Sequence, residues 1–145
     1  MTTQTANGKY DYTQVCGSKQ VTLDFLINHA HRVLSEKSGW NYFPLKKGSF
    51  GYDNMATSIG YMFDHYYPNQ SLDECADNVH KGWTENYIFW RDTLPFQSSP
   101  ELYIAPFNPL GDERRNICAS TPYSQLPQEE KDKDLILAEA VLMYI

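Results

Sequence analysis

The chain has 145 residues and a formal net charge of −6, with 41% hydrophobic and 14% aromatic residues. This length and apolar content predict one domain with a substantial core and exclude a chain that is disordered by composition. The acidic balance argues against a surface that coats nucleic acid, and no apolar run approaches the ~20 residues of a membrane span.

Residues 1–20 are polar and contain Gly8 and Gly17, which predicts a loose N-terminal arm with a short strand near Lys9 to Val15. Because this segment has no hydrophobic signal region, we expect a cytoplasmic protein. The three cysteines are odd in number and widely spaced, which predicts reduced, unbridged thiols and no zinc site. They are Cys16, Cys75 and Cys118.

The rest of the chain, residues 21–145, is expected to form a single compact domain that is mainly α-helical. Four segments carry apolar residues at the i, i+3, i+4 spacing of a helix face. The predicted helices lie near residues 22–38, 53–66, 71–92 and 126–144.

Helix-capping residues support the boundaries of three of these helices. Thr22 is placed as the N-cap of the first helix, and Gly39 can end it in the left-handed conformation. The run Ser71-Leu72-Asp73-Glu74 is a capping box, in which the first and fourth residues satisfy each other's backbone N–H groups. Pro127 suits the first position of the closing helix, whose first turn is acidic.

Two predicted helices contain an internal glycine, Gly60 in the second and Gly82 in the third. Gly60 weakens its helix by roughly 1 kcal/mol relative to Ala unless close packing needs it. Gly82 either gives room to a packed aromatic side chain or marks a kink.

A long connection separates the last two predicted helices. Residues 95–122 hold five of the eight prolines, which predicts a long proline-rich loop without a helix. A short edge strand is expected within it, at Leu102 to Ala105. Loops of this length in small domains are often functional.

Two segments of the second half resemble the ryanodine-receptor (RyR) repeat. Ala76-Asp77-Asn78-Val79-His80-Lys81-Gly82-Trp83 is similar to its opening helix, and Pro122-Tyr123-Ser124-Gln125-Leu126-Pro127-Gln128-Glu129-Glu130-Lys131 with Asp134 is similar to its second half. The resemblance covers about residues 72–145. It departs from the family pattern because Gly82-Trp83 falls within the helix and the connection that follows is much longer.

An alternative register also exists. Residues 30–42, with His31 and Gly39-Trp40-Asn41-Tyr42, also look like the first half of such a repeat. The resemblance implies a small helical module that serves in interaction or ligand binding, with nucleotide-like ligands, and not in catalysis. No cofactor is implied.

Six residues are the candidate ligand-binding set. Aromatic rings can stack on a planar ligand, and cationic or imidazole groups can hold its negative charge. The candidates are Trp83, Trp90 and Tyr123 for stacking, and His80, Arg114 and Arg115 for charge. The competing interpretation places the tryptophans in the core, bonds the histidine to backbone, and pairs the arginines with Asp112 and Glu113.

The expected arrangement is a pocket at the junction of the third and closing helices. The 95–122 segment would fold over it, with Trp83 or Trp90 and Tyr123 as walls. Tyr123 would lie near the exit of the third helix, and Arg114 and Arg115 would be the only cationic lining.

The favoured function is therefore a non-enzymatic module that binds a small anionic ligand. The alternative is an assembly or adaptor protein whose aromatic loops bind a protein partner, a second copy of the chain included. A hydrolase that uses His80 or His65 with a nearby aspartate ranks last, because no catalytic constellation or metal set is legible.

Overall fold

The computed structural model describes residues 3–93 and 109–145. Within these residues the chain is mainly helical, as predicted, with 63% helix and 5% strand. The helices are α1 (Leu23–Ser38), α2 (Phe50–Asp64), α3 (Leu72–Thr93), α4 (Pro109–Ala119) and α5 (Gln128–Leu142), and a 3₁₀ turn spans Tyr123–Gln125. None of these helices is long and apolar enough to cross a membrane. The expected edge strand at 102–105 lies outside the described residues.

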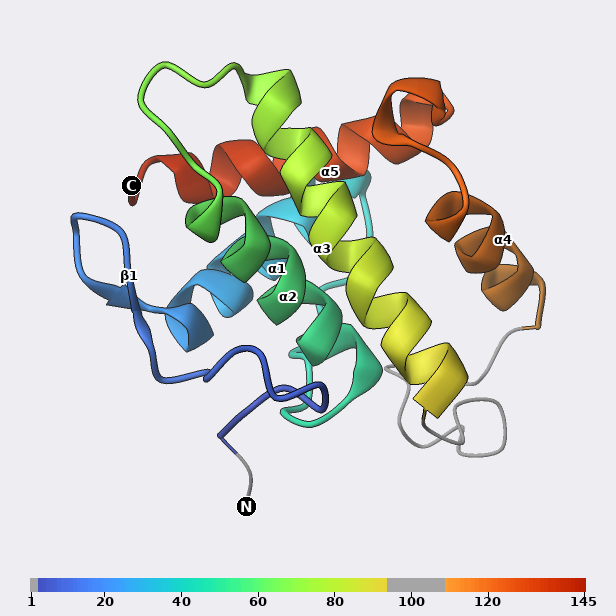
Figure 1. Ribbon diagram of the computed structural model, residues 1–145, viewed down its shortest axis with the longest axis horizontal. Coiled ribbons are helices and arrows are strands. Elements are labelled where there is room, and N and C mark those ends of the chain that lie inside the picture. Colours follow the sequence, from blue (N-terminus) through green and yellow to red (C-terminus); the bar gives the residue numbers. More distant parts are fainter. Residues whose placement is uncertain (1–2, 94–108) are drawn as a thin grey trace.

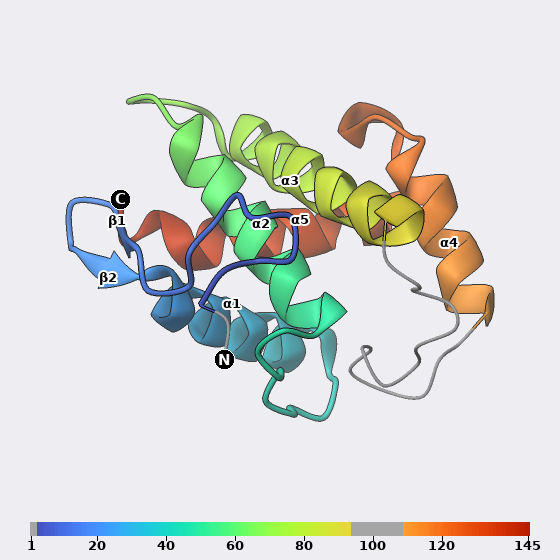
Figure 2. The ribbon, with the colours of Figure 1, turned by 60° about the horizontal axis from the view of Figure 1, so that its bottom comes forward.

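Four helices build the core and α4 lies at its edge (Figures 1 and 2). α2 packs against α1 and along α3, and α5 packs against both α1 and α3. α4 packs mainly on α3. This arrangement leaves α4 beside the first half of α5, so that the polar residues of both helices can meet.

The Thr22 and Gly39 caps are confirmed, as is the Ser71 half of the capping box. Pro127 precedes the first residue of α5 as its N-cap and is not the first helical residue that we predicted. The Phe25 N–H donates to Thr22 Oγ1 (3.1 Å), and the Glu74 N–H donates to Ser71 Oγ (3.1 Å). Gly39 ends α1 with a φ of 71°. α2 begins earlier than predicted, because Ser49 caps it by accepting from the Tyr52 N–H.

The prediction that the proline-rich segment contains no helix is wrong for its second half. α4 spans Pro109–Ala119. A proline at the first helical position loses no hydrogen bond, because the first N–H groups of a helix have no partner within it. The sequence from 110 to 121 contains no further proline, so the helix continues until Ala119.

The prediction of a loose N-terminal arm does not hold for residues 3–20, which pack on α2. A short β-hairpin begins there, in which the two-residue strand β1 (Val15–Cys16) pairs antiparallel with the two-residue strand β2 (Val21–Thr22). Tyr10 and Tyr12 are buried. The Tyr12 hydroxyl and the Ala6 N–H both donate to the carboxylate of Asp53, which has no exposed surface. Buried tyrosines thus anchor a segment whose overall composition is polar.

Gly60 and Gly82, the glycines inside the two predicted helices, mark close contacts. A Cβ on Gly82 would lie 2.4 Å from the Thr57 carbonyl oxygen and 2.9 Å from the Ser58 Cα of α2. A Cβ on Gly60 would lie 2.4 Å from Cε1 of the Tyr10 ring. Gly82 therefore makes room for the backbone of α2, and Gly60 makes room for the N-terminal segment.

Candidate functional site

A cavity of about 450 Å³ opens among α1, α2, α3, α4 and α5. Its apolar wall is formed by side chains of the core and of the segment that joins α1 to α2. They include Leu34, Leu45, Phe50, Met55 and Leu137. Trp40 and Phe43, which are 49% and 63% exposed, also line it. The volume lies within the range of small-molecule sites.

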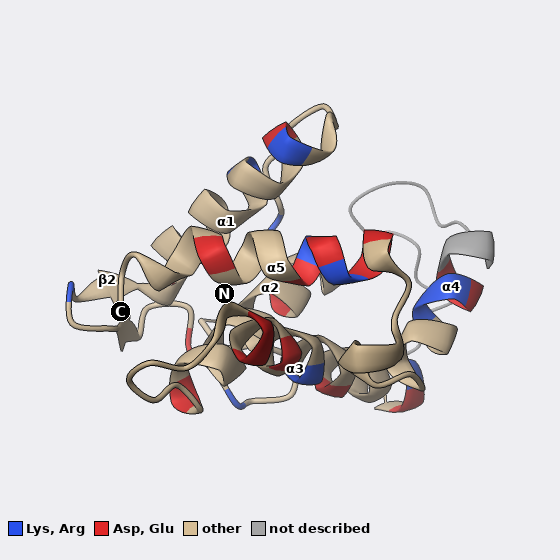
Figure 3. Cartoon of the chain, turned by 90° about the horizontal axis from the view of Figure 1, so that it is seen from above, with Lys and Arg blue, Asp and Glu red and all other residues tan. Residues whose placement is uncertain are grey.

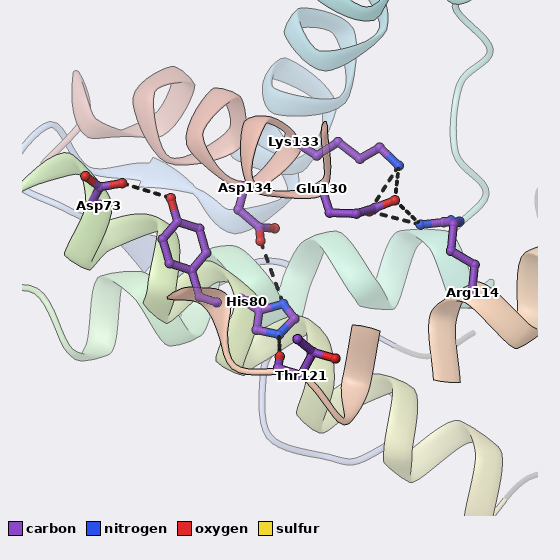
Figure 4. Close-up of polar contacts among 8 residues, drawn as sticks. Asp73, His80, Arg114, Thr121, Glu130, Lys133 and Asp134 are labelled. Carbon is purple, nitrogen blue, oxygen red and sulfur yellow. Dashed lines mark hydrogen bonds and ion pairs between the residues drawn. The ribbon is translucent and has the colours of Figure 1, made fainter. Parts of the chain in front are cut away.

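His80 and Asp134 form the buried polar wall between α3 and α5 (Figure 4). His80 Nε2 lies 2.8 Å from the Thr121 carbonyl oxygen, and its Nδ1 lies 3.7 Å from Asp134 Oδ2. A carbonyl oxygen can only accept a hydrogen bond, so we assign the hydrogen to Nε2. His80 thus joins α3 to the end of α4 and faces α5.

Asp134 is a buried carboxyl group. Burial raises its pKa well above the usual range, and the nearby negative charge of Glu130 raises it further, against the opposing effect of Lys133. The pKa shift favours the neutral carboxyl, because burial disfavours the charged form of an acid.

A second polar group lies where α4 meets α5. Arg114 Nη1 donates to both carboxylate oxygens of Glu130, each at 3.0 Å, and Lys133 Nζ lies 3.4 and 3.3 Å from the same oxygens. Figure 3 shows acidic and basic positions interleaved on the first half of α5 and on α4. All three side chains line the cavity. The expectation that two arginines are the only cationic lining is wrong, because Lys133 also contributes.

Arg115 lies deeper, next to the smaller aromatic cluster of the core. Its Nη1 is 3.8 Å from Asp112 Oδ1, and its guanidinium carbon lies 5.7 Å from the centroid of the Phe50 ring. The alternative pairing of the arginines with acidic neighbours is confirmed for this residue. Arg114 pairs instead with Glu130, which lies on a different helix.

The two candidate tryptophans of α3 have different environments. Trp83 is half-buried, lines the cavity, and stacks between His80 (centroids 6.0 Å apart) and Tyr87 (5.5 Å apart). Trp90 is 1% exposed and packs with Phe50 and Tyr87 in the second hydrophobic cluster. Trp83 is thus a wall of the cavity, whereas Trp90 belongs to the core.

Tyr123 lies outside the cavity lining. Its hydroxyl donates to Asp73 Oδ1 (3.0 Å), so the 3₁₀ turn is tied to the first turn of α3. The expectation that this tyrosine lies near the exit of the third helix is wrong. Thr121 already reaches His80 in the middle of α3, so the chain has run back toward the start of that helix before Tyr123.

The structure therefore brings together four of the six predicted residues. His80, Trp83, Arg114 and Arg115 line one cavity, and Trp90 and Tyr123 do not. Sequence reasoning missed three polar residues of α5, namely Glu130, Lys133 and Asp134. Their i, i+3, i+4 spacing places them on one helix face, which is the signal that could have identified them.

The three cysteines are free, as predicted, and all three are buried. Cys118 lines the cavity, and burial raises the pKa of its thiol, with the negative charge of Glu130 acting in the same direction. Among residues 3–93 and 109–145, no group of three or more His, Cys, Asp or Glu side chains could hold a metal ion.

No protein-family model, no curated protein and no solved structure matches the chain.

Proposed function

We propose that this protein is a non-enzymatic module that binds a small planar anion in the cavity among α1 to α5. The observation that carries the proposal is the joint presence of the half-buried Trp83 and the cationic side chains of Arg114, Arg115 and Lys133 on one apolar cavity. Apolar walls with a few convergent polar groups are typical of small-molecule sites. The resemblance to the RyR repeat stays a prediction and points to the same class of function.

The charge balance of the cavity favours an anion. Three cationic side chains line it, against the carboxyl groups of Glu130 and Asp134 among the described residues. Because the raised pKa of Asp134 favours its neutral form, the lining is more positive than the residue types suggest. In a chain of net charge −6, such a site is a local positive region that can attract an anionic ligand.

The side chains that could perform chemistry are poorly suited to it. Cys118 is buried, and its raised pKa disfavours the thiolate, which is the nucleophilic form. His80 uses Nε2 in a hydrogen bond to backbone, as the competing interpretation proposed. We therefore favour binding over hydrolysis at this site. The buried, unbridged cysteines also fit the reducing cytoplasm, where we propose that the protein acts.

A thermal-shift titration tests the proposal. Phenyl phosphate, benzoate and adenosine monophosphate are added to the purified protein, with benzyl alcohol as the neutral aromatic control. Binding to the folded state raises the melting temperature with ligand concentration. We expect a shift with the anions, which Arg114→Ala reduces. Lys81→Ala is the matched control, because Lys81 is an exposed cation whose partner Asp77 lies outside the cavity.

An adaptor role is the second candidate, and the exposed aromatic residues favour it. Trp40 and Phe43 lie at the cavity and are about half-exposed or more. Aromatic side chains are enriched at protein interfaces. If the aromatic loop is a self-association surface, sedimentation should show an oligomer that the double variant Trp40→Ser/Phe43→Ser dissociates. A protein that stays monomeric at all concentrations would exclude self-association through this loop.

A further inference from the structure

Arg114 and Lys133, two of the cations that line the cavity, already hold an anion, and that anion is part of the chain. Glu130 has 13% of its side-chain surface exposed and lies between Arg114 and Lys133 (Figure 4). Its two carboxylate oxygens receive contacts from both cations, at 3.0 Å from Arg114 and at 3.3 to 3.4 Å from Lys133.

The origin of the two cations distinguishes this group from an ordinary helix-surface ion pair. Lys133 is the i+3 neighbour of Glu130 on α5, and such neighbours commonly pair. Arg114 comes from α4, 16 residues earlier in the chain. Two cations that converge from different helices on one carboxylate form the kind of contact by which proteins recognise carboxylate and phosphate groups.

The ion-paired group of Arg114, Glu130 and Lys133 affects ligand binding because it lines the cavity. Arg114, Glu130 and Lys133 all line the same cavity as Trp83. An anion that enters must either remain beside the negative charge of Glu130 or replace it at the two cations. Like charges close together are unfavourable, and a well-paired cation has less to offer a second anion.

We propose that Glu130 is a built-in competitor, whose carboxylate occupies the place that the carboxylate or phosphate group of an aromatic ligand takes at Arg114 and Lys133. This inference rests on the proposed function and adds to it the ligand class and the residue that limits affinity. Glu130 is a specificity-determining residue, because only an oxyanion can substitute for its carboxylate. Neutral aromatic molecules gain nothing from its displacement.

Isothermal titration calorimetry of the variant Glu130→Gln tests the inference. The probes are benzoate and phenyl phosphate, which separate carboxylate from phosphate, together with inorganic phosphate and benzyl alcohol. Removal of the competing charge should tighten at least one aromatic anion tenfold or more, which corresponds to about 1.4 kcal/mol. Benzyl alcohol should be unaffected. Glu129→Gln, which removes an exposed neighbouring charge, is the matched control for the change in net charge.

The outcomes separate the inference from the proposed function. If neither the wild-type protein nor the variant binds any anion, both are wrong. If the wild-type protein binds an aromatic anion and Glu130→Gln binds it no more tightly, the competitor is disproved while the binding site stands. The competitor role of Glu130 would also be disproved if Glu129→Gln tightened anion binding equally. The same holds if Glu130→Gln tightened the binding of benzyl alcohol as much as that of the anions. Should Glu130→Gln fail to fold, Glu130→Asp decides, because its shorter side chain withdraws from the cations and should tighten binding by a smaller factor.

Discussion

Replacement of Gly82 by alanine tests the packing that positions the cavity. The added Cβ would lie 2.4 Å from the Thr57 carbonyl oxygen, 2.8 Å from Tyr61 Cβ and 2.9 Å from Ser58 Cα. Two of these three atoms belong to the backbone of α2, so they cannot move aside by a change of rotamer. α3 must therefore shift away from α2 by about 1 Å, which forfeits roughly a quarter to a half of the dispersion energy of the affected contacts.

The expected magnitude follows from two opposing effects. Overpacking of a core costs typically about 1–3 kcal/mol, and the upper part of this range applies because the obstruction is backbone. Alanine gains up to about 1 kcal/mol over glycine in helix propensity. We expect a net loss of about 2 kcal/mol in the free energy of unfolding, which lowers the melting temperature by about 4–8 °C in a chain of this size.

The assay is thermal or urea unfolding followed by far-UV circular dichroism. Lys81→Ala, at the adjacent exposed position of the same helix, should change the free energy of unfolding by no more than about 0.5 kcal/mol. A Gly82→Ala protein as stable as the wild type, or more stable, would refute the close approach of α2 and α3. In that case helix propensity would dominate at this position.

Three further predictions concern other parts of the molecule. Gly60→Ala should lower the free energy of unfolding by less than Gly82→Ala, because its added Cβ meets the Tyr10 side chain, which can move. Urea unfolding of the two variants measures the difference. Asp134→Asn should stabilise the protein at pH 7.5 but not at pH 4. The raised pKa of this carboxyl means that stability present near its unfolded pKa of roughly 4 is lost as the pH rises through the folded pKa. Exposed Asp132→Asn serves as control, and an unfolding series that shows no pH-dependent difference would contradict this assignment. Mass spectrometry after thiol alkylation of the denatured protein, isolated without oxidants, should find all cysteines modified, whereas an intramolecular disulfide would contradict the described thiols.

The parts of the fold that could be predicted are those governed by local chemistry. Thr22, Gly39 and Ser71 act through hydrogen bonds or backbone conformation within a few residues, so their roles follow from the sequence itself. The start of α2 is set by Ser49, a good N-cap that apolar periodicity alone does not register. α4 was missed because proline density was weighed without regard to the helical position of Pro109.

The candidate site was only partly predictable, because its members meet through tertiary packing. His80 and Trp83 share one helix face, and Arg114 and Arg115 are adjacent, so each pair could be proposed from the sequence. Whether Trp83 or Trp90 reaches the cavity depends on where α4 and α5 dock on α3. The pairing of Arg114 with Glu130 depends on the same docking, which periodicity does not determine.

The central claim is that an aromatic anion binds in the cavity beside Trp83. An NMR titration that follows the indole N–H signals of the three tryptophans tests it most directly. A ¹H–¹⁵N correlation spectrum of the labelled protein is recorded during titration with phenyl phosphate, and each indole N–H signal is assigned by a Trp→Phe variant. Trp83 lines the cavity, whereas Trp90 lies in the core and is not part of the lining. We predict a saturable shift of the Trp83 signal that exceeds any shift of Trp90 and that Arg114→Ala weakens. A titration that leaves Trp83 unmoved, or that shifts Trp90 more strongly, would contradict binding in this cavity.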